Sequence, residues 1–200
     1  MKVFLGTCEK SAEHLMVDLI KSLSACCPLA KFYVQAQEDT VTSLQSHFDI
    51  QLIYDSSLGA VMGFIEPLKI LPSLLKRRRD LKKWIDNHNP DIVIGIDAPD
   101  FWLPIEKYAK SLNIYTIHVV SPSVWAWRPG RVHYVAQSVH ELFCLFPFEM
   151  KYYQGLDIKL RQFPHPLILT YKELWGRYVK EFSVEQYFLK RRSWYLVCAP

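Results

Sequence analysis

Short apolar segments alternate with amphipathic ones along most of the chain. Near-continuous apolar runs occupy 2–6, 31–36, 50–54, 92–96, 114–120 and 141–146. Such runs are typical of parallel strands that are buried on both faces of a sheet. Between them, apolar residues recur at helical spacing over 11–26, 66–88, 103–112 and 130–138, with a weaker signal after 37. This alternation predicts an α/β fold in which residues 1–175 form one doubly wound, Rossmann-like parallel sheet.

The last part of the chain has a different character. Residues 176–192 are typical of a connecting helix or linker, and 193–200, "SWYLVCAP", form another apolar run. That run is either a final edge strand of the first sheet or the start of a truncated second domain. We favour the second interpretation, because an apolar strand needs further elements to cover it.

Composition narrows the classes of protein. Half of the 200 residues are hydrophobic and 22% are charged, so the chain can bury a sizeable core. A formal net charge of +4 does not indicate a nucleic-acid partner. No C-x-x-C pair occurs, and His118 and His165 lack ligand partners at fixed spacing, so we predict neither a metal site nor a cofactor. Glu9 and Lys10 interrupt the apolar start before it could form a signal peptide, and no run reaches the ~20 apolar residues of a membrane-spanning helix.

Two carboxylates flank a rigid turn where the 92–96 strand ends, in "GIDAPDF". Ligands of open parallel sheets bind outside the carboxyl ends of the strands, so Asp97 is a candidate general base for a substrate hydroxyl. The alternative is a carboxylate that only accepts hydrogen bonds from turn amides. Asp100 precedes an amphipathic stretch, and we expect it to be the helix N-cap, with Pro104 in the first turn.

The segment after the next strand, "SPSVWAWRPGR", combines aromatic and basic residues. Trp125 and Trp127 flank an alanine, and Arg128 and Arg131 follow. Arginines at a strand end can bind phosphate through bidentate, charge-assisted hydrogen bonds. Aromatic packing with a solvated basic rim is the simpler explanation of the tryptophans taken alone.

A basic helix with an apolar stripe is a candidate membrane-contact surface. Apolar residues recur three and four positions apart near the start of the 66–88 region, and a basic cluster follows them. Such a helix can lie among anionic headgroups, although a leucine stripe is more often plain core and Pro72 is expected to kink the helix. The predicted membrane-contact residues are Ile65, Leu68, Leu71, Leu74, Leu75, Lys76, Arg77, Arg78 and Arg79.

Five ordered segments carry a family resemblance: "AVMGFIEPL" (60–68), "PDIVIGIDAPDF" (90–101), "TIHVVSPSVWAWRPGR" (116–131), "LFPFE" (145–149) and "HP" (165–166). Together they resemble the N-terminal, acceptor-side half of the lipid-A-disaccharide synthase family, glycosyltransferases with a two-domain GT-B fold. The resemblance implies transfer of 2,3-diacylglucosamine from its UDP-linked donor to 2,3-diacylglucosamine 1-phosphate, with a β-1,6 bond formed and UDP released. It also implies that Asp97 is the family's essential aspartate.

The same resemblance implies the partners and the location. The partners are an acylated glucosamine phosphate acceptor, a UDP-linked acyl sugar donor and an anionic membrane surface, with no nucleic acid; a homo-oligomer stays open. The location is cytoplasmic, peripheral on the inner face of the bacterial inner membrane. The implied substrate-binding residues are Glu9, Ser11, Glu13, Ser121, Ser123, Trp125, Arg128, Arg131, Glu149 and His165.

Some positions depart from the family pattern. The glycine-rich "GEASGD" of the family corresponds to 8–13, "CEKSAE", which lacks both glycines and therefore backbone freedom near a ligand. The family's Gly-His-Pro reads Pro164, His165 and Pro166, and Val119 replaces a tyrosine. The donor-binding half is expected beyond residue 200, so these residues alone are expected to be inactive.

Functions from different classes therefore stay open. The first is an enzyme, the acceptor half of a lipid-A-disaccharide synthase, which the intact "GIDAPDF" and "SPSVWAWR" segments favour. The second is a non-catalytic lipid-binding, membrane-peripheral module derived from that half, which the altered 8–13 loop favours. A different nucleotide-sugar enzyme on the same fold is a third interpretation.

Overall fold

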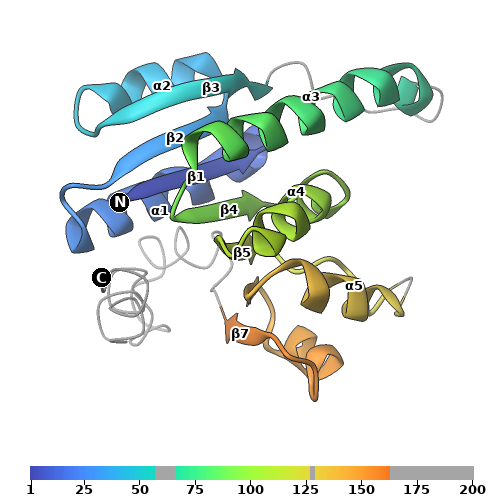
Figure 1. The fold of residues 1–200 in the computed structure, drawn as a ribbon. Helices are drawn as coiled ribbons and strands as arrows, with labels where there is room; N and C mark the ends of the chain where they lie inside the picture. Colours follow the sequence, from blue (N-terminus) through green and yellow to red (C-terminus); the bar gives the residue numbers. More distant parts are fainter. Residues whose placement is uncertain (57–65, 127–128, 163–200) are drawn as a thin grey trace, which may run out of the picture.

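The computed structural model describes residues 1–56, 66–126 and 129–162, in which seven strands form one parallel sheet (Figure 1). The sheet order is β3-β2-β1-β4-β5-β6-β7, so the chain winds outward from β1, crosses back, and winds outward again from β4. The predicted doubly wound α/β fold is confirmed. The strands are β1 Lys2–Thr7, β2 Lys31–Ala36, β3 Ile50–Asp55, β4 Ile92–Ile96, β5 Tyr115–Val119, β6 Glu141–Cys144 and β7 Lys159–Gln162.

Helices cover both faces of this sheet. One face packs against α1 and α2 through residues such as Leu19 and Leu44, and the other packs against α3 and α4 through Leu81 and Trp102. Figure 1 shows α3, α4 and α5 following one another across the front of the sheet. The helices are α1 Glu13–Cys26, α2 Glu38–Gln45, α3 Glu66–His88, α4 Pro99–Ser111 and α5 Arg131–Ser138, with 3-10 turns η1 Lys10–Ala12 and η3 Pro147–Tyr153.

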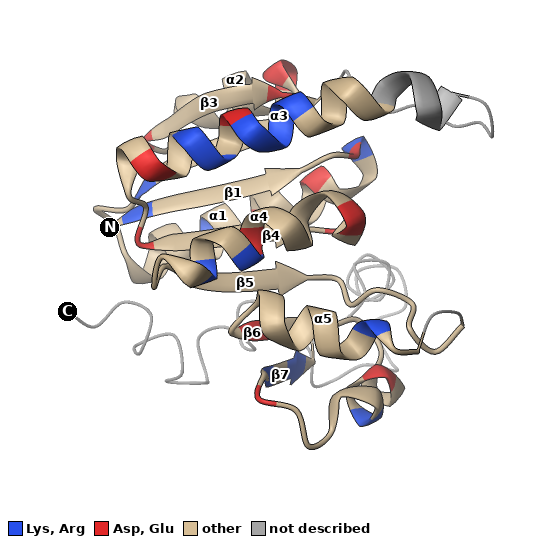
Figure 2. Ribbon diagram, turned by 45° about the vertical axis from the view of Figure 1, so that its right-hand side comes forward, with Lys and Arg blue, Asp and Glu red and all other residues tan. Residues whose placement is uncertain are grey.

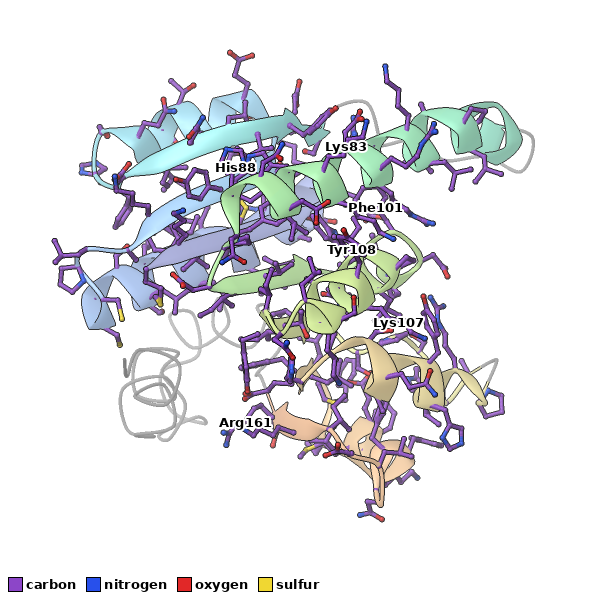
Figure 3. The ribbon with its side chains drawn as sticks, in the orientation of Figure 1. Lys83, His88, Phe101, Lys107, Tyr108 and Arg161 are labelled. Atoms are coloured by element: carbon purple, nitrogen blue, oxygen red, sulfur yellow. The ribbon has the colours of Figure 1, made fainter. Side chains whose placement is uncertain are left out.

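Polar side chains tie α4 to the helices on either side of it. The Tyr108 hydroxyl donates to Asp86 Oδ1 of α3 at 2.6 Å, and Lys107 Nζ donates to Gln137 Oε1 of α5 at 3.1 Å (Figure 3). Each exposed bond contributes little by itself. Together they orient a helix whose first turn follows the candidate base Asp97.

Two strand glycines let α4 approach the sheet closely. Trp102 of α4 is fully buried, and its indole lies where a Cβ at Gly6 would have to be, whereas a Cβ at Gly95 would meet Glu106 Oε1 and the base of the Trp102 side chain. Any larger residue at either position would overlap the ring or its Cβ. The absence of a Cβ is therefore a packing requirement here, and it fixes the height of α4 above β1 and β4.

The start of α4 differs from the sequence prediction. The helix begins at Pro99 rather than at 103, with Ala98 at the N-cap and no side-chain capping bond, so the expected capping role of Asp100 is wrong. Pro suits the first helical position because its fixed φ is already helical. Pro104 consequently lies in the helix interior and has no N–H for the Asp100 carbonyl. A guanidinium nitrogen of Arg78 donates to that carbonyl instead.

The seventh strand was not predicted. The segment of β7, "KLRQ", is short and polar, as edge strands often are. It is attached by the backbone ladder to β6 and by Arg161, whose Nε lies 2.6 Å from Glu141 Oε1 (Figure 3). The predicted linker at 176–192 and strand at 193–200 lie outside the described residues. Within the described part of the chain, no helix is long and apolar enough to cross a membrane.

Candidate functional site

The candidate site lies where the winding direction of the chain reverses. Strands β1 and β4 are neighbours in the sheet, with Thr7 in register with Ile96, yet the chain leaves them toward opposite edges. A crevice at such a point is where doubly wound sheets bind their ligands. The first residues beyond the two strands are Cys8 and Asp97, so the predicted base lies at this position.

The turn that carries Asp97 has an unusual backbone. Asp97 and Ala98 both have positive φ, 56° and 40°, and the Asp97 N–H donates to the Val119 carbonyl at 2.9 Å. Aspartate tolerates the left-handed region, but alanine rarely adopts it, at a cost of about 1–3 kcal/mol. Strained residues of this kind cluster at functional sites. Val120, directly after β5, has φ 79°, which is rarer still for a β-branched residue.

Asp100 and Arg131 form an ion pair across two helices. Arg131 Nη2 lies 2.5 Å from Asp100 Oδ1, with the arginine side chain 14% exposed and the aspartate 76%. The predicted substrate-binding guanidinium of Arg131 therefore has a protein partner that joins α5 to the first turn of α4. The pair lies between the loop that follows β4 and the loop that follows β5.

The two glutamates of the 8–13 segment accept hydrogen bonds from neighbouring side chains and backbone. Glu9 and Ser11 are exposed, and the Ser11 hydroxyl donates to Glu9 Oε2 at 3.3 Å. Glu13 is buried, and its carboxylate accepts from the Gln37 N–H at 2.7 Å, from Thr40 Oγ1 and from Ser56 Oγ. Both Glu13 oxygens are thus used to join the start of α1 to α2 and to the end of β3.

Cys8 lies next to the charged groups of the site. Burial raises the pKa of its thiol to about 12, and the nearby Arg77 guanidinium opposes this rise. The Glu9 and Asp97 carboxylates act in the same direction as burial. The thiol of Cys8 is therefore protonated at neutral pH, and its position marks a place where Arg77, Glu9 and Asp97 come near one another.

A second cluster forms from the loops after β5 and β6. The Ser121 hydroxyl is buried and lies 3.1 Å from the Tyr153 hydroxyl. Trp125 is 46% exposed and packs edge-on against Phe148, with ring centres 5.5 Å apart. The structure thus brings together several predicted positions and adds Tyr153, which lies 32 residues beyond Ser121 and has no local sequence signal that connects the two.

Glu149 completes this second cluster. The residue is 3% exposed, and its carboxylate accepts the Phe146 N–H at 3.1 Å. Burial raises the pKa of Glu149, whereas hydrogen bonds from the backbone of this turn and from Trp125 oppose the rise. Ser123 is exposed. The other predicted substrate-binding residues, Arg128 and His165, lie outside the described residues.

The predicted membrane-contact helix is only partly exposed. Leu71 and Leu75 are 45% and 44% exposed, and Lys76 and Arg79 face solvent as well. In Figure 2 the ribbon of α3 is blue at its basic positions, with red acidic positions between them. Ile65 and the side chain of Leu68 are outside the described part of the chain.

Three residues of the predicted membrane surface are turned inward instead. Leu74 packs against the core beneath α3, and Arg77 is 8% exposed above the Tyr54 ring. Arg78 lies over Phe101, 5.7 Å from its ring centre. Arg77 is thus buried, and Leu74 and Arg78 are only partly exposed, because this side of α3 packs against β3 and α4; a membrane contact of these residues stays a prediction.

No metal site is evident in the described ranges, where no group of three or more His, Cys, Asp or Glu residues is arranged to hold an ion. A hollow of about 760 Å³ lies beside the ends of β2 and β3, away from Asp97. Its lining includes the acids Glu38, Asp39 and Asp55, so it repels anions.

Solved structures of other proteins share the fold of this domain. A UDP-GlcNAc 2-epimerase from Neisseria meningitidis matches with a TM-score of 0.58 at 14% identity, covering 87% of this chain and 50% of that one. The forosaminyltransferase SpnP matches with a TM-score of 0.53 at 13% identity, covering 81% and 50%. Identities this low show the fold alone: a Rossmann-like α/β domain of the kind found in GT-B enzymes.

Sequence comparison then identifies the family. Residues 3–177 match the family model described as lipid-A-disaccharide synthetase. The lipid-A-disaccharide synthases of Alkalilimnicola ehrlichii and Xylella fastidiosa are 38% and 42% identical over 172 and 159 residues, covering 83% and 80% of this chain. The chain belongs to the lipid-A-disaccharide synthase family. It spans about two fifths of the length of these relatives, 42% and 40%.

Proposed function

We propose that this chain forms the acceptor-binding half of a lipid-A-disaccharide synthase and that Asp97 is its general base. The carboxylate takes the proton from the 6-hydroxyl of 2,3-diacylglucosamine 1-phosphate. The resulting oxygen attacks C1 of UDP-linked 2,3-diacylglucosamine, a β-1,6 bond forms, and UDP leaves with the electrons of the broken C1–O bond. The chain spans about two fifths of the length of its relatives, and we propose that the rest of that length holds the donor.

One observation carries the proposal: Asp97 follows β4 at the reversal point of the sheet, in a strained left-handed turn. A residue there borders the crevice in which doubly wound folds bind ligands. A carboxylate that served only as a turn acceptor would not require Ala98 to adopt a left-handed conformation as well. Membership of the family supports the particular reaction.

A second candidate is a non-catalytic lipid-binding module derived from the same enzyme. The arrangement of Glu13 favours it, because both carboxylate oxygens are used by Gln37, Thr40 and Ser56 and are not free for a ligand. This candidate predicts acceptor binding without any transfer.

We also propose that the protein attaches peripherally to the anionic inner face of the bacterial inner membrane. The support comes from Leu71 and Leu75, two exposed leucines one helical turn apart, with Lys76 and Arg79 beside them. Apolar area and basic charge on one helix both favour binding to an anionic surface. Acylated substrates are delivered most directly to a site at that surface.

The test joins this chain to the donor half of the Xylella fastidiosa relative and measures disaccharide formation by mass spectrometry. Asp97→Asn should lower turnover ~10²–10⁴-fold while the protein stays folded. Asp91→Asn is the matched control, because Asp91 lies at the opposite end of the same strand and only binds the Lys2 N–H. If Asp97→Asn kept its turnover, the base assignment would be wrong; a folded but inactive parent chimera that binds acceptor would favour the non-catalytic module.

A further inference from the structure

Arg77 is a buried cation that forms no ion pair within the described part of the chain. Arg77 is 8% exposed, whereas Lys76 and Arg79 on the same helix are exposed. The guanidinium carbon lies 5.5 Å from the centre of the Tyr54 ring. Among the ion pairs of the described residues, Arg131 and Arg161 each have a carboxylate partner and Arg77 has none.

Burial of this kind is costly for a structural residue. A guanidinium has five N–H donors and remains charged at every relevant pH. Contact with an aromatic face offsets only a small part of the loss of hydration. No Arg77 nitrogen is among the fully buried, unpartnered atoms of the described residues, and no ion pair with Arg77 occurs in these ranges. The guanidinium therefore remains able to bind a small anion.

The position of Arg77 is that of a ligand-binding residue. It lies on the sheet face covered by α3, beside Tyr54 near the end of β3 and close enough to Cys8 to influence its thiol. Cys8 follows β1, and Asp97, which acts on the same thiol, follows β4. The guanidinium therefore lies at the carboxyl edge of the sheet, within the candidate site.

We propose that Arg77 binds the phosphate group of the sugar phosphate substrate through two parallel hydrogen bonds. The inference rests on the proposed function, in which both substrates carry phosphate: a 1-phosphate on the acceptor and a diphosphate on the donor. A planar guanidinium matches two phosphate oxygens, and a buried location strengthens the contact. Arg77 then holds the phosphate while Asp97 faces the hydroxyl, so opposite charges serve opposite ends of a substrate.

The experiment measures binding of soluble probes to this chain by calorimetry at one ionic strength. The probes are glucosamine 1-phosphate, UDP and uncharged N-acetylglucosamine. Arg77→Gln should weaken binding of a phosphate probe at least about 10-fold, as expected for loss of charge-assisted hydrogen bonds. A loss confined to glucosamine 1-phosphate would assign Arg77 to the acceptor, and a loss confined to UDP would assign it to the donor.

Lys83→Gln is the matched control, because Lys83 is exposed on the same helix and loses the same charge (Figure 3). It should change affinity less than about twofold, since a single exposed charge is screened by salt. Equal effects of Arg77→Gln and Lys83→Gln, or no phosphate binding by the parent chain, would overturn the proposal.

A second variant distinguishes loss of phosphate binding from a folding defect. Arg77→Lys keeps the charge but not the bidentate geometry, so it should retain the circular dichroism spectrum and bind the phosphate probe several-fold more weakly. Full affinity in a folded Arg77→Lys protein would contradict bidentate binding. Suppose that Asp97→Asn abolishes transfer but that phosphate binding does not depend on Arg77. The proposed function would then stand, and this inference alone would be refuted.

Discussion

The Nδ1 atom of His118 lies 2.9 Å from Oε1 of Glu106, and neither side chain is exposed to solvent. The same Oε1 accepts the Gly95 N–H at 3.1 Å, and Gly95 is in register with His118 across β4 and β5. This carboxylate therefore joins α4 to two strands directly before the turn that holds Asp97.

Removal of this carboxylate should destabilise the fold strongly. Glu106→Leu leaves the Gly95 N–H and the His118 ring without their partner, and a buried polar group left unsatisfied typically costs ~1–3 kcal/mol. Glu106→Gln should cost less, because the amide can still accept from Gly95 and bond to His118. Denaturant unfolding measures both. A Leu variant as stable as the parent would show that the pair does not hold the fold together.

Gly6→Ala should be destabilising for a different reason. The added methyl group would overlap the Trp102 ring, and overpacking of a core typically costs ~1–3 kcal/mol. Gly130→Ala is the control, because a Cβ at Gly130 meets no atom within 4 Å and its φ is −63°. Thermal melts should separate the two variants. Equal melting temperatures would mean that Trp102 moves aside without cost.

The cysteines should differ in their reaction with iodoacetamide. Burial raises the pKa of Cys8 and of Cys144 to about 12, whereas Cys26 is exposed. The reactive thiolate is therefore scarce at Cys8 and Cys144 at pH 8, and peptide mass spectrometry should find Cys26 modified first. Because the two raised pKa values lie above the unfolded value of 9.0, their contribution to stability should be present below pH 9 and be lost as pH rises toward 12. Fast labelling of Cys8 in the folded protein at pH 8 would contradict its burial.

Membrane binding should depend on the exposed side of α3 only. Replacing Leu71 and Leu75 by serine should weaken co-sedimentation with anionic vesicles about tenfold or more at every salt concentration, with little change in melting temperature. Replacing Lys76 and Arg79 by serine should weaken the free energy of vesicle binding by ~1 kcal/mol for each residue, and mostly at low salt. Leu81→Ser is the control, since this fully buried residue should lower the melting temperature sharply. Unchanged vesicle binding in the Leu71/Leu75 variant would remove the membrane proposal.

Much of the fold followed from the local pattern. Buried strands such as 31–36 and 92–96 are apolar over their whole length, so sequence reasoning located them within a residue or two. The start of α4 and the strand β7 were missed, because neither depends on local apolarity. Pro99 initiates a helix that Arg78 supports from α3, and β7 is held by Arg161 and the edge of β6.

The sequence by itself determined that an aspartate, Asp97, stands at the end of a buried strand, because strand position is set by neighbouring residues along the chain. Only the tertiary structure decided which basic residues of α3 face the site. Lys76, Arg77 and Arg79 look alike in the sequence, but the helix turns 100° per residue and β3 packs on one side, so only Arg77 is buried. The pairing of Glu106 with His118 was likewise decided by packing, because a contact between a helix and a strand depends on how the two elements lie against each other, which no local pattern encodes.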